Sequence, residues 1–141
     1  LWYARGDRWV AAHVGDSRLY LVGSAQIVQL TKDHSLGQRM LDEGEIEDGV
    51  DVLAQYGHIL TQGLGLKPTL KPELCSGLFS ELSPGDRFLL CSDGLSTSVA
   101  DDILGTKARL PDIAQAGDEL LQSGLDYGGK DNISLVLIDL P

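Results

Sequence analysis

The sequence predicts an α+β fold, with antiparallel strands at both ends of the chain and helices between the later strands. Three observations favour this class. The first thirty residues alternate short apolar runs with turns, residues 95–104 and 111–123 have helical apolar spacing, and residues 133–140 form a last apolar run. A chain of 141 residues with 43% hydrophobic content can bury one core, so we expect residues 1–141 to form a single domain.

The opening stretch predicts a meander of strands. The strands are expected at residues 1–4, 9–14, 18–22 and 27–30. The pairs Gly6-Asp7 and Gly23-Ser24 are typical of turns, and each lies between two of these runs. Strands joined by such short turns pair antiparallel.

The second and third of these runs differ in the parity of their apolar residues. Even-numbered positions up to Val14 are apolar in the second run, whereas odd-numbered positions from Leu19 are apolar in the third. Successive side chains of a strand face opposite sides, so the inward face switches across Gly15 and Asp16. An extra residue in a β-bulge would produce this switch, and it would place Asp16 at a distorted point of a strand.

The middle of the chain predicts one helix and one strand. Ser35 is a favourable N-cap for a helix over residues 36–43, and Gly44 is a favourable end. Residues 42–51 contain six acidic side chains and little apolar content, which is typical of a mobile, solvated surface segment. A strand is expected over residues 70–79.

The last part of the chain predicts a turn, a strand, two helices and a final strand. These are expected over residues 83–86, 87–92, 95–104, 111–123 and 133–140. Pro84 fixes the φ angle at the second position of the turn. Pro111 suits the first turn of the second helix, and Gly124 is a favourable stop.

The chain is strongly acidic, with a formal net charge of −10. Such a surface repels phosphate backbones and anionic headgroups, which argues against nucleic acid and membrane surfaces as partners. Neither a long apolar run nor a signal-peptide pattern is present. Cys75 and Cys91 lack CxxC spacing, and Cys91 lies in an apolar run as a buried thiol would. We therefore expect a cytoplasmic protein, and a monomer.

The chain opens at Leu1, directly in strand-like sequence. A natural N-terminus is more often polar and frayed. We expect this sequence to be a piece of a longer protein.

Two aspartates stand where a loop meets an apolar strand. Asp93 follows the strand over residues 87–92, and Asp131 precedes the strand over residues 133–140. If these strands pair antiparallel, both carboxylates lie at one edge of the sheet. Close carboxylates repel unless a cation lies between them, and oxygen-only ligands suit Mg²⁺ or Mn²⁺. Each aspartate by itself is equally compatible with an ordinary turn.

Five short segments narrow the function that the sequence predicts. They are residues 14–21 (VGDSRLYL), 30–35 (LTKDHS), 60–65 (LTQGLG), 86–95 (DRFLLCSDGL) and 128–134 (GGKDNIS). In this order they resemble successive motifs of the type 2C (PPM) metal-dependent serine/threonine protein phosphatases, in a bacterial form. The five matches span nearly the whole chain, whereas any one of them alone would be a weak signal.

The resemblance implies a sandwich of two antiparallel β-sheets flanked by α-helices, with a centre of two Mn²⁺ or Mg²⁺ ions at one edge. It implies that Asp93 and Asp131 are metal ligands that take part in catalysis through the bound ions. Asp16 is implied as a ligand of a possible third ion, although a turn-capping role is about as compatible with its position. The reaction implied is hydrolysis of phosphoserine and phosphothreonine in proteins by a metal-activated water.

Four other polar residues are expected to support the structure rather than to bind metal. Arg18 is expected to pair with a carboxylate, and Asn132 to orient its loop by hydrogen bonds. His13 and His34 are expected to be packing or capping residues. The resemblance further implies phosphoprotein substrates, a cognate serine/threonine kinase, and a gating role for residues 42–51.

The family's N-terminal motifs, which supply further metal ligands, are absent from this chain, as are the strands that carry them. Gln62 and Gly63 also stand where the family usually has Arg-Ala. The chain by itself is therefore expected to lack part of the active site. Two other functions stay open, namely a non-catalytic pseudophosphatase module that binds phosphoproteins or regulates a kinase, and a metal-free interaction domain.

Overall fold

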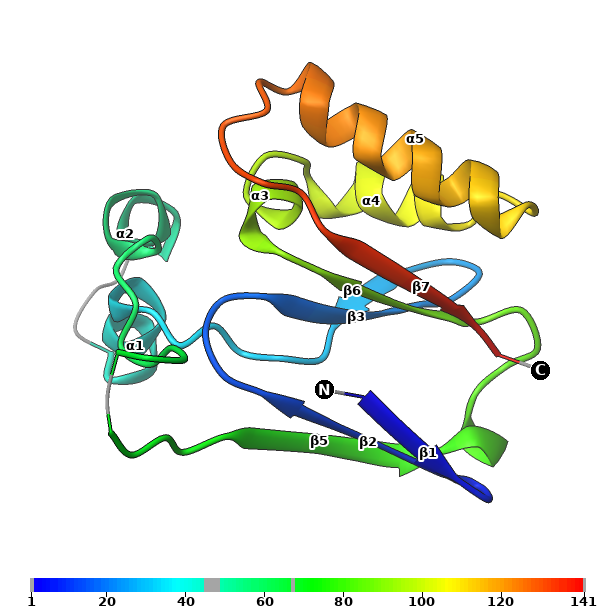
Figure 1. Cartoon of the computed structure of the whole chain (residues 1–141), viewed down its shortest axis with the longest axis horizontal. Helices are drawn as coiled ribbons and strands as arrows, with labels where there is room; N and C mark the ends of the chain where they lie inside the picture. The colour runs from blue at the N-terminus through cyan, green and yellow to red at the C-terminus, as the bar shows by residue number, and fades with distance from the viewer. Residues whose placement is uncertain (1, 45–48, 67, 141) are drawn as a thin grey trace.

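The protein is a sandwich of two antiparallel sheets with helices against one of them (Figure 1). A computed structural model describes residues 2–44, 49–66 and 68–140. In these residues the smaller sheet has the order β1 (Trp2–Arg5), β2 (Arg8–His13) and β5 (Glu73–Leu78). The larger sheet has the order β4 (Ile27–Gln29), β3 (Arg18–Val22), β6 (Arg87–Cys91) and β7 (Leu135–Asp139). The predicted α+β sandwich is confirmed.

The larger sheet is covered on both faces. On one face, helices α4 (Asp101–Ala108) and α5 (Ile113–Asp126) pack over Tyr20 and Leu89, whose side chains are completely buried (Figure 1). On the other face, Phe88 meets Trp9 of the smaller sheet edge-to-face, with ring centroids 4.8 Å apart. Burying apolar side chains on both faces of β3 and β6 fixes the layers relative to each other.

The segment between β2 and β3 is not a bulge, and that prediction is wrong. β2 pairs with β1 and β5, whereas β3 pairs with β4 and β6, so the chain changes sheets across residues 14–17. The buried side chains of β2 are Trp9, Ala11 and His13 rather than the even-numbered set. Asp16 lies on the crossover between the two sheets.

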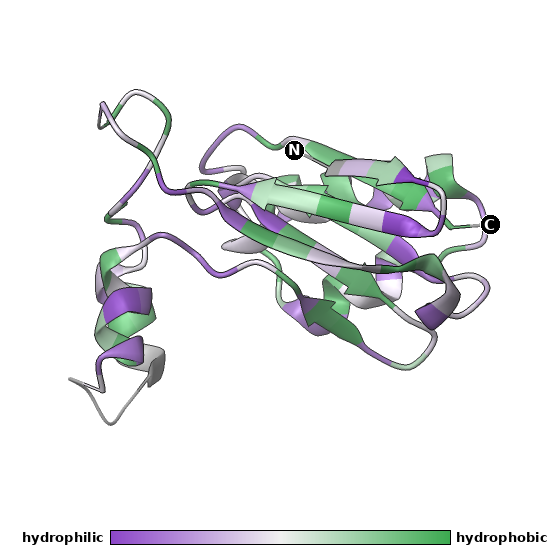
Figure 2. Ribbon diagram, turned by 90° about the horizontal axis from the view of Figure 1, so that it is seen from below, coloured by the Kyte–Doolittle hydropathy of each residue, from purple (hydrophilic) through white to green (hydrophobic). Residues whose placement is uncertain are grey.

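Helix α1 (Leu36–Asp42) has the predicted caps, since the Ser35 hydroxyl accepts a hydrogen bond from the Gln38 amide and Gly44 has a φ of 67°. Part of the predicted acidic surface segment is helical, because helix α2 (Gly49–Tyr56) begins inside it. Residues 45–48 of that segment lie outside the described residues. Figures 1 and 2 show α1 and α2 at one end of the sandwich.

The helix predicted over residues 95–104 is two helices. Short α3 (Asp93–Ser96) begins directly after β6, and the extended backbone of Ala100 separates it from α4. Asp101 and Asp102 then occupy the first turn of α4, where negative charge is favourable. Leu95 of α3 and Val99, which lies between the two helices, are both buried.

Helix α5 also differs from its prediction at both ends. Its N-cap is Asp112, whose carboxylate accepts a hydrogen bond from the Gln115 amide, so Pro111 precedes the helix. Gly124 does not stop it. A Cβ at Gly124 would lie 2.5 Å from Cδ1 of Ile133, so this glycine allows α5 to approach the segment before β7.

Figure 2 shows apolar residues alternating with polar ones along the strands of the sandwich. Among the described residues, no helix is both long enough and apolar enough to cross a bilayer.

Candidate metal centre

Asp93 and Asp131 leave neighbouring strands at the same end of the larger sheet. β6 and β7 pair antiparallel, with Cys91 opposite Leu135. Asp93 is the first residue of α3 after β6, and Asp131 lies in the loop that leads to β7. The structure therefore brings the two predicted segments side by side (Figure 1).

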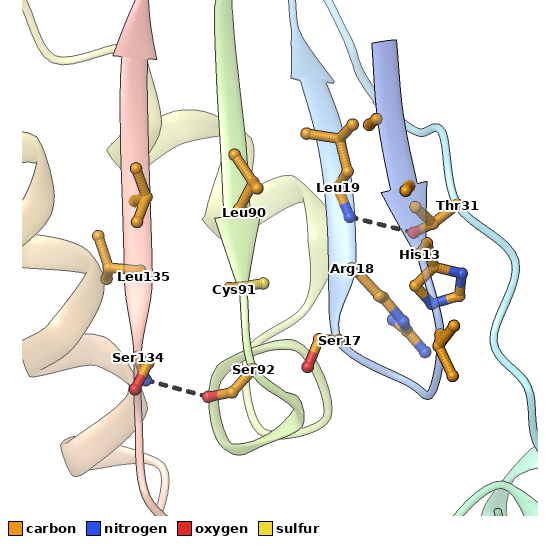
Figure 3. Close-up of a pocket in the computed structure, with 14 residues that line it drawn as sticks. His13, Ser17, Arg18, Leu19, Thr31, Leu90, Cys91, Ser92, Ser134 and Leu135 are labelled. Atoms are coloured by element: carbon orange, nitrogen blue, oxygen red, sulfur yellow. Dashed lines mark hydrogen bonds between the residues drawn. The ribbon is translucent and has the colours of Figure 1, made fainter. Parts of the chain in front are cut away.

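Ser92 joins the two segments. Its amide donates to the carbonyl oxygen of Ser134 at 2.9 Å, and its hydroxyl donates to the carbonyl oxygen of Asn132 at 3.1 Å. The Ser134 amide donates back to the Ser92 hydroxyl at 3.0 Å (Figure 3). Three hydrogen bonds through one residue fix the end of β6 against the loop before β7.

Gly94 allows this close approach. A Cβ at Gly94 would lie 2.5 Å from the carbonyl oxygen of Asn132 and 3.2 Å from that of Asp131. Backbone atoms cannot move aside as a flexible side chain can. Position 94 must therefore be a glycine, because the segment that carries Asp131 leaves no room for a Cβ.

Each of the two carboxylates accepts a hydrogen bond from the next backbone amide. Asp93 Oδ1 accepts from Gly94 at 2.9 Å, and Asp131 Oδ1 accepts from Asn132 at 2.7 Å. Asp93 is half-buried and Asp131 is exposed. Both carboxylates keep oxygen lone pairs available for a ligand.

Asp16 approaches Asp93 from the crossover between the sheets. Burial raises the pKa of Asp16, and the negative charge of Asp93 raises it further. A carboxylate whose proton affinity is raised by a neighbouring negative charge is stabilised by a cation as well as by a proton. The oxygen donors at this end of the larger sheet therefore suit Mg²⁺ or Mn²⁺.

The crossover is held by the ion pair that the sequence predicted for Arg18. Its Nη2 lies 2.8 Å from Oδ2 of Asp33, and its Nε lies 3.0 Å from Oδ1. Arg18 also donates to the Tyr20 hydroxyl at 3.1 Å. This forked contact fixes Arg18, which lies two positions after Asp16. The predicted carboxylate partner of Arg18 is therefore confirmed.

A largely apolar cavity of about 290 Å³ lies between the two sheets near this end (Figure 3). Leu19, Leu90 and Leu135 line it, and Ser92 and Ser134 stand at the edge nearest Asp93.

One cluster of potential ligands was not predicted. His13, His34 and Glu73 offer ligand atoms that all lie within 4.8 Å of one another, a spacing that Asp16, Asp93 and Asp131 do not meet in the described part of the chain. The three residues come from distant points of the sequence, so only the pairing of β2 with β5 and the fold of the segment after β4 reveal the group.

The comparisons with known proteins agree with this architecture. PstP of Mycobacterium tuberculosis, a serine/threonine protein phosphatase, is 35% identical over 138 residues, which cover 96% of this chain and 26% of PstP. The serine/threonine phosphatase stp of Listeria monocytogenes is 35% identical over 134 residues, which cover 92% of this chain and 51% of that protein. The chain belongs to the PPM phosphatase family. No family profile matches the sequence.

Solved PPM phosphatases have the same fold over this part. The catalytic domain of PstP in complex with two manganese ions superposes with a TM-score of 0.81 at 33% identity, covering 98% of this chain and 56% of that one. Stp1 of Staphylococcus aureus superposes with a TM-score of 0.88 at 30% identity, covering 99% and 54%. The chain thus spans between a quarter and a little over half of the PPM phosphatases it matches, and it corresponds to a C-terminal portion of their catalytic domain.

Proposed function

We propose that the protein carrying this chain hydrolyses phosphoserine and phosphothreonine in other proteins, with divalent cations held by Asp93, Asp131 and Asp16. The observation that carries the proposal is the joining of the Asp93 and Asp131 segments at one end of β6 and β7. The similarity to phosphatases from several bacteria supports the same reaction.

The proposed cofactors are two Mn²⁺ or Mg²⁺ ions, with a third where Asp16 takes part. When bound, such ions lower the pKa of a water and stabilise charge on phosphoryl oxygens. Asp93 and Asp131 would provide carboxylate oxygens from a rigid sheet end. Ser92 keeps their segments together, and Arg18 with Asp33 keeps the crossover that bears Asp16 in place.

We further propose that residues 1–141 are one part of a phosphatase domain and that the rest of the domain completes the metal ligands. The isolated chain is then inactive. The α1–α2 segment lies at the same end of the sandwich as the aspartates (Figure 1), which supports a gating role for residues 42–51. The two free thiols favour a reducing, cytoplasmic compartment. The similarity to serine/threonine phosphatases supports a serine/threonine kinase as the opposing enzyme, and we propose that the protein is a monomer.

The test uses the full-length protein and a phosphothreonine peptide with Mn²⁺. Asp93→Asn keeps the size of the side chain and removes its charge, and Asp118→Asn on the exposed surface of α5 is the matched control. We expect Asp93→Asn to lower turnover by at least about a hundredfold, since stabilisation of transition-state charge by a bound metal ion is worth several kcal/mol. Asp118→Asn should leave turnover unchanged.

Full activity of folded Asp93→Asn would refute the assignment. A folded wild-type protein that binds the phosphopeptide but releases no phosphate with Mn²⁺ or Mg²⁺ would favour the non-catalytic phosphoprotein-binding module instead.

A further inference from the structure

We propose that His13, His34 and Glu73 form a second metal site, for a cation of the Zn²⁺ class, separate from the aspartate centre. The three residues converge from the end of β2, the segment after β4 and the start of β5. Their ligand atoms lie within 4.8 Å of one another.

The backbone arranges this group independently of any ligand. His13 and Glu73 are direct cross-strand partners in the smaller sheet. His34 is attached by its backbone, since its amide donates to the Gly15 carbonyl at 2.8 Å and its carbonyl accepts from the Thr61 amide at 2.7 Å. The two imidazole rings lie 4.7 Å apart between centroids.

Both histidines are buried without enough hydrogen-bond partners. His13 is 8% exposed and His34 is 7% exposed. Neither nitrogen of His13 has a partner with hydrogen-bond geometry, although the Gly15 backbone lies close enough to oppose the lowering of its pKa. Nε2 of His34 has no hydrogen-bond partner either. A buried polar atom without a partner is costly, and three of them on two adjoining rings point to a missing ligand.

The chemistry of the donor set selects the cation. Two imidazoles with one carboxylate are a set that binds zinc while leaving a fourth position open. A cavity of about 40 Å³ lies beside the group and is lined by His13, Glu73 and Cys75 among others, which is room for one solvent molecule in that position. Burial, followed by the neighbouring His34, lowers the pKa of His13, so its ring is neutral and can donate a lone pair.

The ligand atoms must move closer to close the site. Bond lengths of about 2.0 Å place tetrahedral zinc ligands about 3.3 Å apart, whereas His34 Nε2 and Glu73 Oε1 are 3.7 Å apart. The Glu73 side chain is 54% exposed and has free torsions to make this adjustment.

Binding of a cation at this site would remove a hydrogen bond of the Gly15 amide. Nδ1 of His34 accepts the Gly15 amide at 3.1 Å, so the ring carries its proton on Nε2. A cation on Nε2 needs the lone pair of that atom, so the single N–H proton of the neutral ring moves from Nε2 to Nδ1 by exchange with solvent. The Gly15 amide loses its acceptor. Cation binding at this second site therefore loosens Gly15, which on the proposed function directly precedes the metal ligand Asp16.

The experiment titrates the full-length protein with Co²⁺, a spectroscopic substitute for Zn²⁺, in excess Mg²⁺, which occupies the oxygen-only sites. We expect one equivalent of Co²⁺ to bind with intense visible bands of a low-coordinate, nitrogen-ligated ion. Glu73→Gln removes one ligand on an exposed side chain, and Glu81→Gln is the matched exposed control. Glu73→Gln should weaken Co²⁺ binding at least about tenfold, and Glu81→Gln should not.

A second readout follows the Gly15 amide by NMR. Its resonance should move when Zn²⁺ binds to the wild type and stay in place in Glu73→Gln at the same Zn²⁺ concentration. Absence of the bands in the wild type, or equal Co²⁺ affinity in Glu73→Gln, would overturn the proposal. Asp93→Asn should keep the bands while losing phosphatase activity, which separates this site from the proposed function.

Discussion

Ser92 and Ser134 are joined by two hydrogen bonds, one in each direction, across the ends of β6 and β7. The Ser92 amide donates to the Ser134 carbonyl at 2.9 Å, and the Ser134 amide donates to the Ser92 hydroxyl at 3.0 Å. The Ser134 contribution is entirely backbone, whereas Ser92 also uses its side chain. The two serines therefore make a matched pair for mutation.

Ser92→Ala should weaken Mn²⁺ binding by about tenfold, because residues that orient ligands from outside the coordination sphere have effects of about this size. The free energy of unfolding should fall by about 1 kcal/mol, the net value of a hydrogen bond. Calorimetric Mn²⁺ titration and urea unfolding of the full-length protein measure the two effects. Ser134→Ala is the control, and an equal loss of Mn²⁺ affinity in it would argue against a specific role for the Ser92 hydroxyl.

Gly94→Ala should disrupt the centre more strongly than Ser92→Ala. The added Cβ would lie 2.5 Å from the Asn132 carbonyl oxygen, so the segment bearing Asp131 must shift. We expect Mn²⁺ affinity to fall further than in Ser92→Ala. Gly117→Ala is the control, because its Cβ would meet only Leu135 Cδ1 at 3.9 Å and lies inside α5. That change should add up to about 1 kcal/mol of stability through helix propensity. Unchanged Mn²⁺ binding in Gly94→Ala would contradict the steric argument.

Arg18→Lys should lower the free energy of unfolding by about 1 to 2 kcal/mol, because an ammonium group cannot reproduce the forked contact with Asp33. The pair is mostly shielded from solvent, with side chains 19% and 12% exposed. Arg39→Lys is the control, since its contact with Glu43 is 3.9 Å long and exposed and should change stability by less than about 0.5 kcal/mol. Denaturant unfolding measures the free energy of unfolding of both variants. Equal losses would mean that the Arg18–Asp33 pair contributes no more than a surface ion pair.

Tyr20 should make the protein less stable in alkali. Burial raises the pKa of this phenol well above its ordinary value of 10.0, and Asp101 raises it further while Arg18 opposes the shift. The unfolded chain therefore releases the Tyr20 proton at a lower pH than the folded protein does. Stability from this group is fully present below about pH 10 and declines as pH rises above it.

Tyr20→Phe removes the ionisation together with the hydroxyl contacts. It should be less stable than wild type at neutral pH, and the difference between the two should narrow above about pH 10. Urea unfolding at several pH values measures this difference. A difference that stays constant into alkali would show that Tyr20 ionises normally in the folded protein.

Local features of the structure were predictable from the sequence because local chemistry determines them. The cap at Ser35 and the turn ahead of β6 follow from the side chains and φ preferences of a few adjacent residues. The antiparallel pairing of β6 with β7, which brings the Asp93 and Asp131 segments together, was a condition of the sequence argument, and the structure meets it.

Features that depend on distant contacts were not predictable. The change of sheet before Arg18 was not predictable, because the local apolar pattern there was equally consistent with a bulge within one sheet. Gly124 has the usual form of a helix stop, and only its close approach to Ile133 explains why a glycine stands inside the helix. The His13 cluster needs three segments that meet only in the folded chain.

The crossover from one sheet to the other attaches the three aspartates differently. Asp93 and Asp131 flank neighbouring strands of the larger sheet, and Ser92 joins their segments. Asp16 instead lies between the two sheets, which contact each other through side chains such as Trp9 and Phe88. The separation of Asp93 from Asp131 therefore depends on one strand pair, whereas the separation of Asp16 from Asp93 depends on how the two layers stack.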